Sequence, residues 1–443
     1  MSGLIMAAQL ILGLSILVTL HELGHFLAAR MFGIKVEKFY LFFDAWGIKL
    51  FSFKKGDCEY GIGWLPFGGY VKIAGMVDES MDKDQLAQPA QPWEFRSKPA
   101  WQRLIVMVAG VVMNVILGIA IFSMSLLHYK GSYLKNDAVT HGIVAYKLGE
   151  EIGLRTGDKV VAIDGKSFDR FDDLLSTRVL FGATLTVIRN GEKVEIEVPD
   201  DFYKKTGPNA RSLFLGAGHL TYVVKEVVVG ENAFKAGVEN DDIITEVDKQ
   251  KITGEDFMQR YFADKKGETA LLSIIRAGKP MDITVNISSK GTIGVRYNGD
   301  VVVPADYVKT PYTLASAFAF GTSDAFETLV SNAKGFKKLF KGEEKFQESV
   351  QGPIGIAKIY GGTWDWPHFW VLTGLLSMIL AFMNILPIPA LDGGHVLFLL
   401  IESVTRRKFS DAFMEKTQVV GMVLLLSLMV FVIGNDIWRA FIK

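Results

Sequence analysis

The sequence predicts a polytopic α-helical membrane protein, with four transmembrane helices and two tandem α+β domains inserted between the second and third helices. Three observations predict this class. The 443 residues are 49% hydrophobic, which is high for a soluble chain and modest for one made only of membrane helices. Four apolar stretches are each long enough to cross a bilayer. The long segment between the second and third stretches contains an internal repeat.

The transmembrane helices are predicted from the need for about 20 mostly apolar residues across the hydrocarbon core. Those that qualify run from Leu4 to Arg30, from Leu104 to Leu127, from Phe369 to Leu386 and from Val419 to Ile437. The first has no Lys or Arg before Arg30 and no small-residue cleavage site, which favours a retained helix over a cleaved signal peptide. The stretch Leu314 to Phe326 is shorter and contains Ser, Thr and Asp, so we expect an interfacial amphipathic helix there.

Basic residues predict the orientation of the helices. The loop after the first helix is rich in Lys and Arg, Lys83 among them, and the loop between the third and fourth carries Arg406, Arg407 and Lys408. Both loops are therefore expected in the cytoplasm, with the long insertion and both termini outside it. The expected division is 1–31 (first transmembrane helix), 32–102 (cytoplasmic loop), 103–128 (second helix), 129–221 and 222–300 (inserted domains), 301–365 (linker with the amphipathic helix), 366–395 (third helix), 396–416 (cytoplasmic loop) and 417–443 (fourth helix).

The internal repeat lies within the inserted segment. Residues 160–168 (VVAIDGKSF) resemble 243–252 (IITEVDKQKI), and 184–198 (TLTVIRNGEKVEIEV) resemble 271–285 (LLSIIRAGKPMDITV). Each of the later pair is predicted to be a β-hairpin with an Asn-Gly or Ala-Gly turn. The residues FDDLLSTRV and GEDFMQRYF between them are expected to be helical.

The Gly-Leu-x-x-Gly-Asp stretch from Gly153 to Asp158 resembles the PDZ domains of bacterial proteases. The second copy departs from it, because Asp241 stands where the second glycine is expected. PDZ domains bind extended peptides by adding a strand to a sheet edge. Two PDZ-like domains are therefore expected here, either as binders of peptide ligands or as spacers and size filters.

Composition restricts the kinds of site that the chain can build. The formal net charge is zero, so no basic excess indicates a nucleic-acid partner. Cys58 is the single cysteine, which excludes an intrachain disulfide framework and a zinc site made of cysteines. Any zinc site must therefore use His, Asp and Glu.

A candidate metal-binding motif ends the first apolar stretch, where residues 21–25 read His-Glu-Leu-Gly-His. On a helix, positions i and i+4 share one face, so His21 and His25 can bind one Zn²⁺, and Glu22 can act as general base on a metal-bound water. The pattern also arises by chance, and the three residues could simply be polar groups at a helix end. Ionisable groups are costly within an apolar helix, and a bound cation accounts for all three.

A catalytic zinc usually takes a third protein ligand and keeps one open position. Asp392 is the best candidate because it follows the third apolar stretch directly. Pro387 and Pro389 are expected to break the helix there, and irregular backbone is tolerated at this depth where it lines a cavity. His395 is the weaker alternative ligand.

The two motifs together resemble the site-2 protease family of intramembrane zinc metalloproteases. They are HELGH in the first helix and, from Asn384, Asn-x-x-Pro-x-Pro-x-Leu-Asp-Gly-Gly. The resemblance covers essentially the whole chain, and it implies that His21, His25 and Asp392 ligate zinc, that Glu22 activates water and that Asn384 contacts the substrate backbone. The second helix departs from the family pattern, because AGVVMNV (109–115) lacks the Gly-Pro often found before the residue matching Asn114.

The cytoplasmic loop carries Gly61, Gly63, Gly68 and Gly69 among aromatic residues. The resemblance implies a hairpin that re-enters the membrane near the site and binds the unwound substrate through these glycines. An ordinary cytoplasmic hairpin is the alternative. Residues 351–355 (Gln-Gly-Pro-Ile-Gly) also resemble the family, without a role that the sequence identifies.

The predicted function is therefore intramembrane proteolysis of single-pass membrane proteins in a bacterial inner membrane, with the PDZ-like pair limiting substrate access from outside the cytoplasm. The resemblance implies anti-sigma factors and remnant signal peptides as substrates. Two other classes remain open: a metal- or ion-handling membrane protein, and a non-catalytic adaptor that uses its PDZ-like pair. A transporter would tolerate loss of the Glu22 carboxylate, and an adaptor would tolerate loss of the whole metal site.

Overall fold

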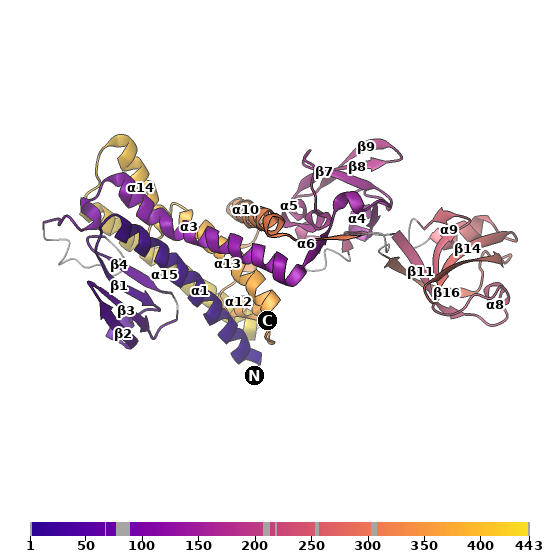
Figure 1. Cartoon of the computed structure of the whole chain (residues 1–443), viewed down its shortest axis with the longest axis horizontal. Helices are drawn as coiled ribbons and strands as arrows, with labels where there is room; N and C mark the ends of the chain where they lie inside the picture. The colour runs from indigo at the N-terminus through magenta and orange to yellow at the C-terminus, as the bar shows by residue number, and fades with distance from the viewer. Residues whose placement is uncertain are drawn as a thin grey trace. The chain divides into compact units, whose positions relative to one another are not determined.

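The computed structural model describes residues 2–66, 68–76, 89–206, 213–217, 219–252, 257–302 and 308–441 (Figure 1). Lys83, the predicted helical residues 254–256 and part of the 301–365 linker lie outside these ranges. The chain divides into two compact units: Met1–Gly131 with Tyr312–Lys443, and Ser132–Pro311. The first unit is mainly helical and holds the candidate site, and the second is rich in β-strands.

Four helices in the described part of the chain are long and apolar enough to cross a membrane, as predicted. They are α1 (Ser2–Met31), α3 (Ala100–Ser125), α13 (Trp366–Ile385) and α15 (Asp411–Phe441). A π-helical turn, η3 (Leu126–Lys130), extends α3. The chain is thus a multi-pass membrane protein. Its first unit also contains the short helices η1 (Ala45–Gly47), η2 (Phe95–Ser97), α11 (Phe346–Ser349) and α12 (Pro353–Tyr360).

The helix break predicted near Pro387 and Pro389 is confirmed. Helix α13 ends at Ile385, residues 386–391 are not helical, and Ala390 has a φ of 73°. A new helix, α14, then runs over Asp392–Thr405. Residues 396–405 were expected in a loop and are instead helical, because the apolar run after Gly394 contains no further proline or glycine.

The amphipathic helix is longer than predicted. Helix α10 covers Leu314–Phe340, far beyond the expected end at Phe326. A capping box starts it: Ser316 N donates to Thr313 Oγ1 at 3.1 Å, and Thr313 N donates to Ser316 Oγ at 2.9 Å. The buried residues Ala317, Gly321 and Ala325 recur every fourth position and form one stripe. This stripe of small residues lets α10 pack closely against α3.

Helix α3 is the centre of the first unit and packs against α1, α10, α13 and α14. Small residues allow the closest approach. A Cβ atom on Gly24 of α1 would lie 2.4 Å from the carbonyl oxygen of Ala109 in α3, so the two helices can meet at this distance only with glycine there. Such small-residue contacts are typical of helix packing in membranes.

The Gln-Gly-Pro-Ile-Gly motif at 351–355 forms the start of α12. Its backbone N–H groups at Gly352, Ile354 and Gly355 donate to the Asp436 carboxylate of α15 at 3.1, 2.9 and 3.0 Å. The four N–H groups at a helix start lack intrahelical partners. Asp436 therefore caps α12 and holds the fourth transmembrane helix against it.

A four-stranded sheet follows α1, in the order β2-β3-β1-β4. Its strands are β1 (Val36–Leu41), β2 (Lys49–Lys55), β3 (Cys58–Gly63) and β4 (Tyr70–Ile73). Strand β1 pairs with β3 in parallel and with β4 antiparallel, so β4 is an edge strand. Figure 1 shows the sheet beside α1, and both β1 and β4 contact that helix.

The predicted glycine-rich hairpin differs from the observed one. The hairpin is β2–β3, turning at Gly56, and Gly61 and Gly63 lie within β3, whereas Gly68 and Gly69 precede β4. Strand β1 separates the two pairs of glycines. A Cβ on Gly61 would meet the Tyr40 ring at 2.4 Å. The β3 glycines therefore make room for neighbouring residues within the sheet, a use that sequence order alone does not show.

The second unit contains two hydrophobic cores. Around the first core lie a three-stranded sheet β7-β8-β9 and the pairs β10-β6 and β17-β5. Around the second core lies the sheet β15-β14-β12-β11-β16, with β13 paired to β12. The strands are β5 (Ser132–Leu134), β6 (Ile143–Ala145), β7 (Lys159–Ile163), β8 (Ala183–Arg189), β9 (Glu192–Val198), β10 (Leu215–Ala217), β11 (His219–Val227), β12 (Ile243–Val247), β13 (Gln250–Lys251), β14 (Thr269–Arg276), β15 (Lys279–Asn286), β16 (Val295–Val302) and β17 (Lys309–Pro311).

The two predicted hairpins are confirmed as β8–β9 and β14–β15. Asn190 and Ala277, the first residues of the two turns, both have positive φ, as do the glycines that follow them. Residues 171–179 form a 3₁₀ helix, η5 (Phe171–Leu175), and a short helix, α5 (Thr177–Leu180), rather than one helix. The other helices among the described residues of this unit are η4 (Asn136–Ala138), α4 (Lys147–Glu151), α6 (Tyr203–Thr206), α8 (Asn232–Lys235) and α9 (Phe257–Asp264).

Both halves of this unit contain the same ion pair, in which the carboxylate is buried and the arginine is partly exposed. In the first half, Arg189 donates to both oxygens of Asp158 at 2.8 and 2.7 Å and to Gly153 O at 2.7 Å. In the second half, Arg276 donates to both oxygens of Asp242 at 2.7 Å and to Gly237 O at 2.7 Å. The repeat seen in the sequence is therefore a structural repeat.

We expect Asp242→Ala to lower the free energy of unfolding by about 1.5–3 kcal/mol, because it removes the hydrogen bonds that Arg276 and the backbone N–H of Glu239 donate to this buried carboxylate. The measurement is pulse proteolysis of the purified full chain at increasing urea concentration, which gives the urea midpoint at which the 132–311 unit unfolds. The control is Asp282→Ala, which removes an exposed pair with Lys249 and should have little effect. Equal midpoints for the two variants would show that the pair of Arg276 with Asp242 does not stabilise this unit.

Candidate metal centre

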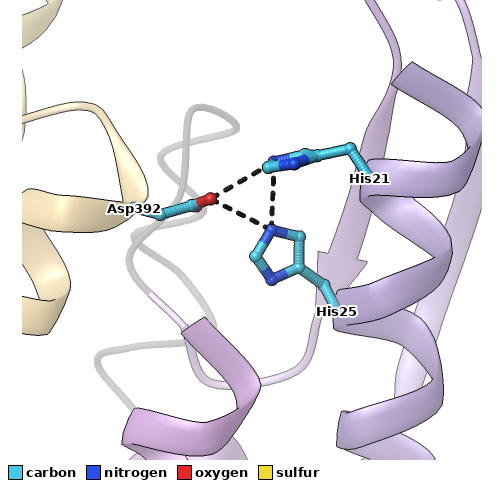
Figure 2. A group of neighbouring side chains, drawn as sticks. All are labelled: His21, His25 and Asp392. Atoms are coloured by element: carbon cyan, nitrogen blue, oxygen red, sulfur yellow. Dashed lines mark hydrogen bonds and ion pairs between the residues drawn. The ribbon is translucent and has the colours of Figure 1, made fainter. Parts of the chain in front are cut away.

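Three potential metal ligands meet at the junction of α1 and α14. His21 and His25 lie one turn apart on α1, and Asp392 is the first residue of α14. Figure 2 shows the two imidazoles and the carboxylate pointing toward one another. Asp392 Oδ2 lies 3.2 Å from His21 Nε2 and 3.3 Å from His25 Nε2, and the two Nε2 atoms are 3.3 Å apart. The structure thus brings together the three residues that the sequence suggested.

The size of this triangle fits a tetrahedral zinc ion. Nitrogen and oxygen ligands bind zinc at about 2.0–2.1 Å, so two ligand atoms of one tetrahedron lie about 3.3–3.4 Å apart. All three observed separations are close to that value. Asp392 Oδ2 is also buried and has no hydrogen-bond partner in the described part of the chain. A cation would satisfy this oxygen and explain why three polar groups converge in an apolar region.

One face of helix α3 packs against both imidazoles. His25 Nδ1 donates to Val106 O at 2.8 Å, and Asn114 Nδ2 lies 3.0 Å from His21 Nδ1. Gly110 lies between them on the same face, and a Cβ atom there would come within 2.3 Å of His25 Nε2. The positions 106, 110 and 114 thus follow the four-residue spacing of His21 and His25. Sequence reasoning missed this set, although a buried Asn in an apolar helix was a usable signal.

Glu22 lines a cavity of about 460 Å³ together with His21, His25 and Asp392. The other walls come from the β4 region, from Met107 of α3, from the residues just before Asp392 and from α15. Lining residues in those walls are Gly69, Tyr70, Val71, Lys72, Ile73, Ala390, Leu391 and Gln418. The Glu22 carboxylate thus lies beside the three clustered groups, at the wall of a cavity large enough to hold water molecules.

The remaining predicted site residues have different outcomes. Asn384 is buried near the end of α13, and its Nδ2 lies 3.3 Å from His21 Nε2, so it belongs to this cluster. His395 lines the cavity but is not one of the three clustered ligands. Among the four glycines, Gly69 lines the cavity and the other three do not. Strand β4 therefore borders the cavity, whereas the β3 glycines do not.

A charged network forms the part of the cavity wall that the sheet contributes. Asp44 accepts hydrogen bonds from Lys38 Nζ at 3.0 Å and from Tyr70 OH at 2.8 Å. Burial acts to raise the Asp44 pKa, but these two hydrogen bonds outweigh it and lower that pKa. Burial, followed by the bond to Asp44, raises the Tyr70 pKa. Asp44 is thus ionised and Tyr70 protonated at neutral pH.

Comparison with known proteins finds one matching family and relatives that align over nearly the whole chain. The model of peptidase family M50 matches residues 9–428. The regulator of sigma-E protease RseP of Escherichia coli (strain K12) is 29% identical over an alignment of 458 positions that covers 98% of both chains. A putative zinc metalloprotease of Xylella fastidiosa (strain Temecula1) is 28% identical and covers 97% of both chains. The regulator of sigma E protease of Haemophilus influenzae is 27% identical, over 99% of this chain and all of that one.

Proposed function

Because the chain belongs to peptidase family M50 and is a zinc metalloprotease, we propose that it cleaves peptide bonds within the transmembrane segments of single-pass membrane proteins. The observation that carries this proposal is the cluster of His21, His25 and Asp392, whose ligand atoms lie 3.2–3.3 Å apart where α14 begins beside the membrane-spanning helix α1. We assign these three residues as the zinc ligands. The chemistry would then take place between the helices that cross the bilayer.

Zinc bound by these residues would polarise the scissile carbonyl and lower the pKa of a bound water molecule. Glu22 accepts the proton of the attacking water and passes it to the leaving amine nitrogen. Asn384, at the end of α13, offers its side-chain amide to the substrate backbone. Such a contact matters because an unwound segment has no water in the bilayer to satisfy its polar groups.

We propose that the substrate lies as an extended strand along β4. This strand is at the sheet edge and lines the cavity, and sheet edges bind peptides by adding a strand. The β2–β3 hairpin of the same sheet exposes Leu50, Phe51 and Phe53 by 69, 57 and 51% of their surface. An exposed apolar patch of this kind suits contact with lipid, which supports a hairpin that re-enters the membrane.

The β-rich unit is proposed to consist of two PDZ-like domains that limit access by bulky substrates from outside the cytoplasm, with or without binding peptides themselves. Both termini lie on that same side in this proposal, and the membrane is the bacterial inner membrane. Two of the relatives carry the name regulator of sigma-E protease. By analogy with them, we propose anti-sigma factors as substrates. Remnant signal peptides are a second proposed class of substrate. If the purified protein cleaved no substrate but transported ions, the transporter function would be favoured. If it cleaved no substrate but bound partner proteins, the adaptor function would be favoured.

The test is cleavage of a labelled single-pass substrate by the purified protein in liposomes. Untreated protein, chelator-treated protein and chelator-treated protein with zinc restored are compared, and the cut position is determined by mass spectrometry. We expect cleavage within the transmembrane segment, its loss on chelation and its recovery with zinc. Cleavage that resists complete removal of zinc, or cuts confined to the parts of the substrate outside the membrane, would overturn the proposal.

A further inference from the structure

Asn114 is a polar residue in the apolar helix α3 that faces the metal centre. Its side chain is fully buried, and its Nδ2 lies 3.0 Å from His21 Nδ1. This contact is on the far side of the imidazole from Nε2, the atom that faces Asp392. Burying an amide in an apolar environment costs free energy unless it is hydrogen-bonded, so this position calls for a specific role.

The two ligand histidines need a defined tautomer to bind a metal. His25 Nδ1 lies 2.8 Å from Val106 O. A backbone carbonyl can only accept, so His25 Nδ1 carries the hydrogen and Nε2 keeps its lone pair for the centre. For His21 to present an Nε2 lone pair in the same way, its Nδ1 must also carry a hydrogen and must donate it to an acceptor.

Asn114 holds an acceptor of the kind that His21 requires. Its Oδ1 is buried and has no hydrogen-bond partner among the described residues. The oxygen and nitrogen of an amide have nearly the same shape, so which of them faces a neighbour is decided by hydrogen bonding. A half-turn of the amide about its terminal bond places Oδ1 against His21 Nδ1, where it can accept the Nδ1–H, and moves Nδ2 to the position that Oδ1 held.

We propose that Asn114 is the positioning residue for His21, and that its Oδ1 accepts the Nδ1–H of His21 when zinc is bound. The inference rests on the proposed assignment of His21 as a zinc ligand. The contact fixes the tautomer and the ring orientation, as the Val106 carbonyl does for His25. Metal-ligating histidines commonly have such partners, and their loss typically lowers metal affinity by about 10–100-fold.

The backbone around Asn114 is held independently of the metal centre. Ser377 Oγ of α13 donates to Asn114 O at 2.8 Å, and both residues are buried. The position of the Asn114 main chain is therefore fixed by helix packing rather than by His21. This contact provides a matched control, because it can be removed while the Asn114 side chain is kept.

The test measures the zinc dissociation constant of the purified full chain by competition with a chromogenic chelator. Asn114→Leu removes the acceptor at similar volume, Asn114→Asp keeps an acceptor, and Ser377→Ala removes the backbone contact alone. We expect zinc binding to weaken by about 10–100-fold in Asn114→Leu and to stay close to wild type in the other two. Asn114→Ala, which also lacks the acceptor, replaces Asn114→Leu if the latter does not fold, as judged by thermal unfolding of the metal-free protein.

Two results would overturn the inference. One is wild-type zinc affinity in a folded Asn114→Leu or Asn114→Ala variant. The other is an equal loss in Asn114→Leu and Asn114→Asp, which would assign the effect to packing rather than to a hydrogen-bond acceptor. His21→Ala separates this inference from the proposed function: unchanged zinc binding in that variant would overturn the ligand assignment itself.

Discussion

Replacement of Glu22 with Gln is expected to reduce the rate of substrate cleavage by about 10²–10⁴-fold, the usual contribution of a general base, while zinc content stays at the wild-type level. Glutamine has nearly the same shape as glutamate but cannot accept a proton from water. Glu22 lines the cavity but is not one of the three clustered ligands, so the metal should remain. The measurement is initial cleavage rate in liposomes together with bound zinc per chain.

The matched control for Glu22→Gln is Glu192→Gln, the same substitution at an exposed position in β9. It should leave both the cleavage rate and the zinc content unchanged. A Glu22→Gln variant that binds zinc and cleaves at the wild-type rate would exclude Glu22 as the base. A variant that loses zinc would instead show that Glu22 contributes to metal binding.

Gly110→Ala is expected to abolish zinc binding and, with it, cleavage. The added Cβ would lie 2.3 Å from His25 Nε2 and 2.7 Å from His21 Cε1, which are distances that no side chain can adopt without displacing both imidazoles. Alanine also favours a helix interior by about 1 kcal/mol over glycine. A loss of zinc can therefore not be attributed to a weakened helix. Zinc stoichiometry and thermal unfolding of the metal-free protein measure the two effects separately.

Gly118→Ala is the control within the same helix, since its Cβ would approach the flexible side chain of Met378 rather than the metal centre. We expect it to retain zinc. If Gly110→Ala retained about one zinc per chain, then α3 would not pack as closely against the two histidines in the zinc-bound protein as it does in this structure.

The metal ligands could be predicted from the sequence because each has a local signature. His21 and His25 share a helix face through their spacing, and Asp392 stands next to two prolines at the end of an apolar stretch. Gly110 has no such signature, and Asn114 has only its polarity within an apolar helix. Their roles arise from the packing of α3 against α1, between residues more than 80 positions apart, and a sequence pattern does not specify which faces of two helices meet.

The sheet shows the same limit. The parallel pairing of β1 with β3 separates glycines that lie close together in the sequence, so a hairpin across Gly61–Gly69 was the wrong expectation. In the β-rich unit, by contrast, the residue that departs from the repeat keeps the same backbone conformation. Asp241 has a φ of 67° where the first copy has Gly157 at 93°, and Asp is among the few residues that tolerate this conformation.

The central claim is that His21, His25 and Asp392 hold one catalytic zinc ion. X-ray absorption at the zinc edge of the purified protein tests it most directly. The account predicts about one zinc per chain, nitrogen and oxygen ligands at about 2.0–2.1 Å, scattering from two imidazoles, and loss of this site in Asp392→Ala. A sulfur ligand at about 2.3 Å, or an unchanged spectrum in Asp392→Ala, would contradict the account.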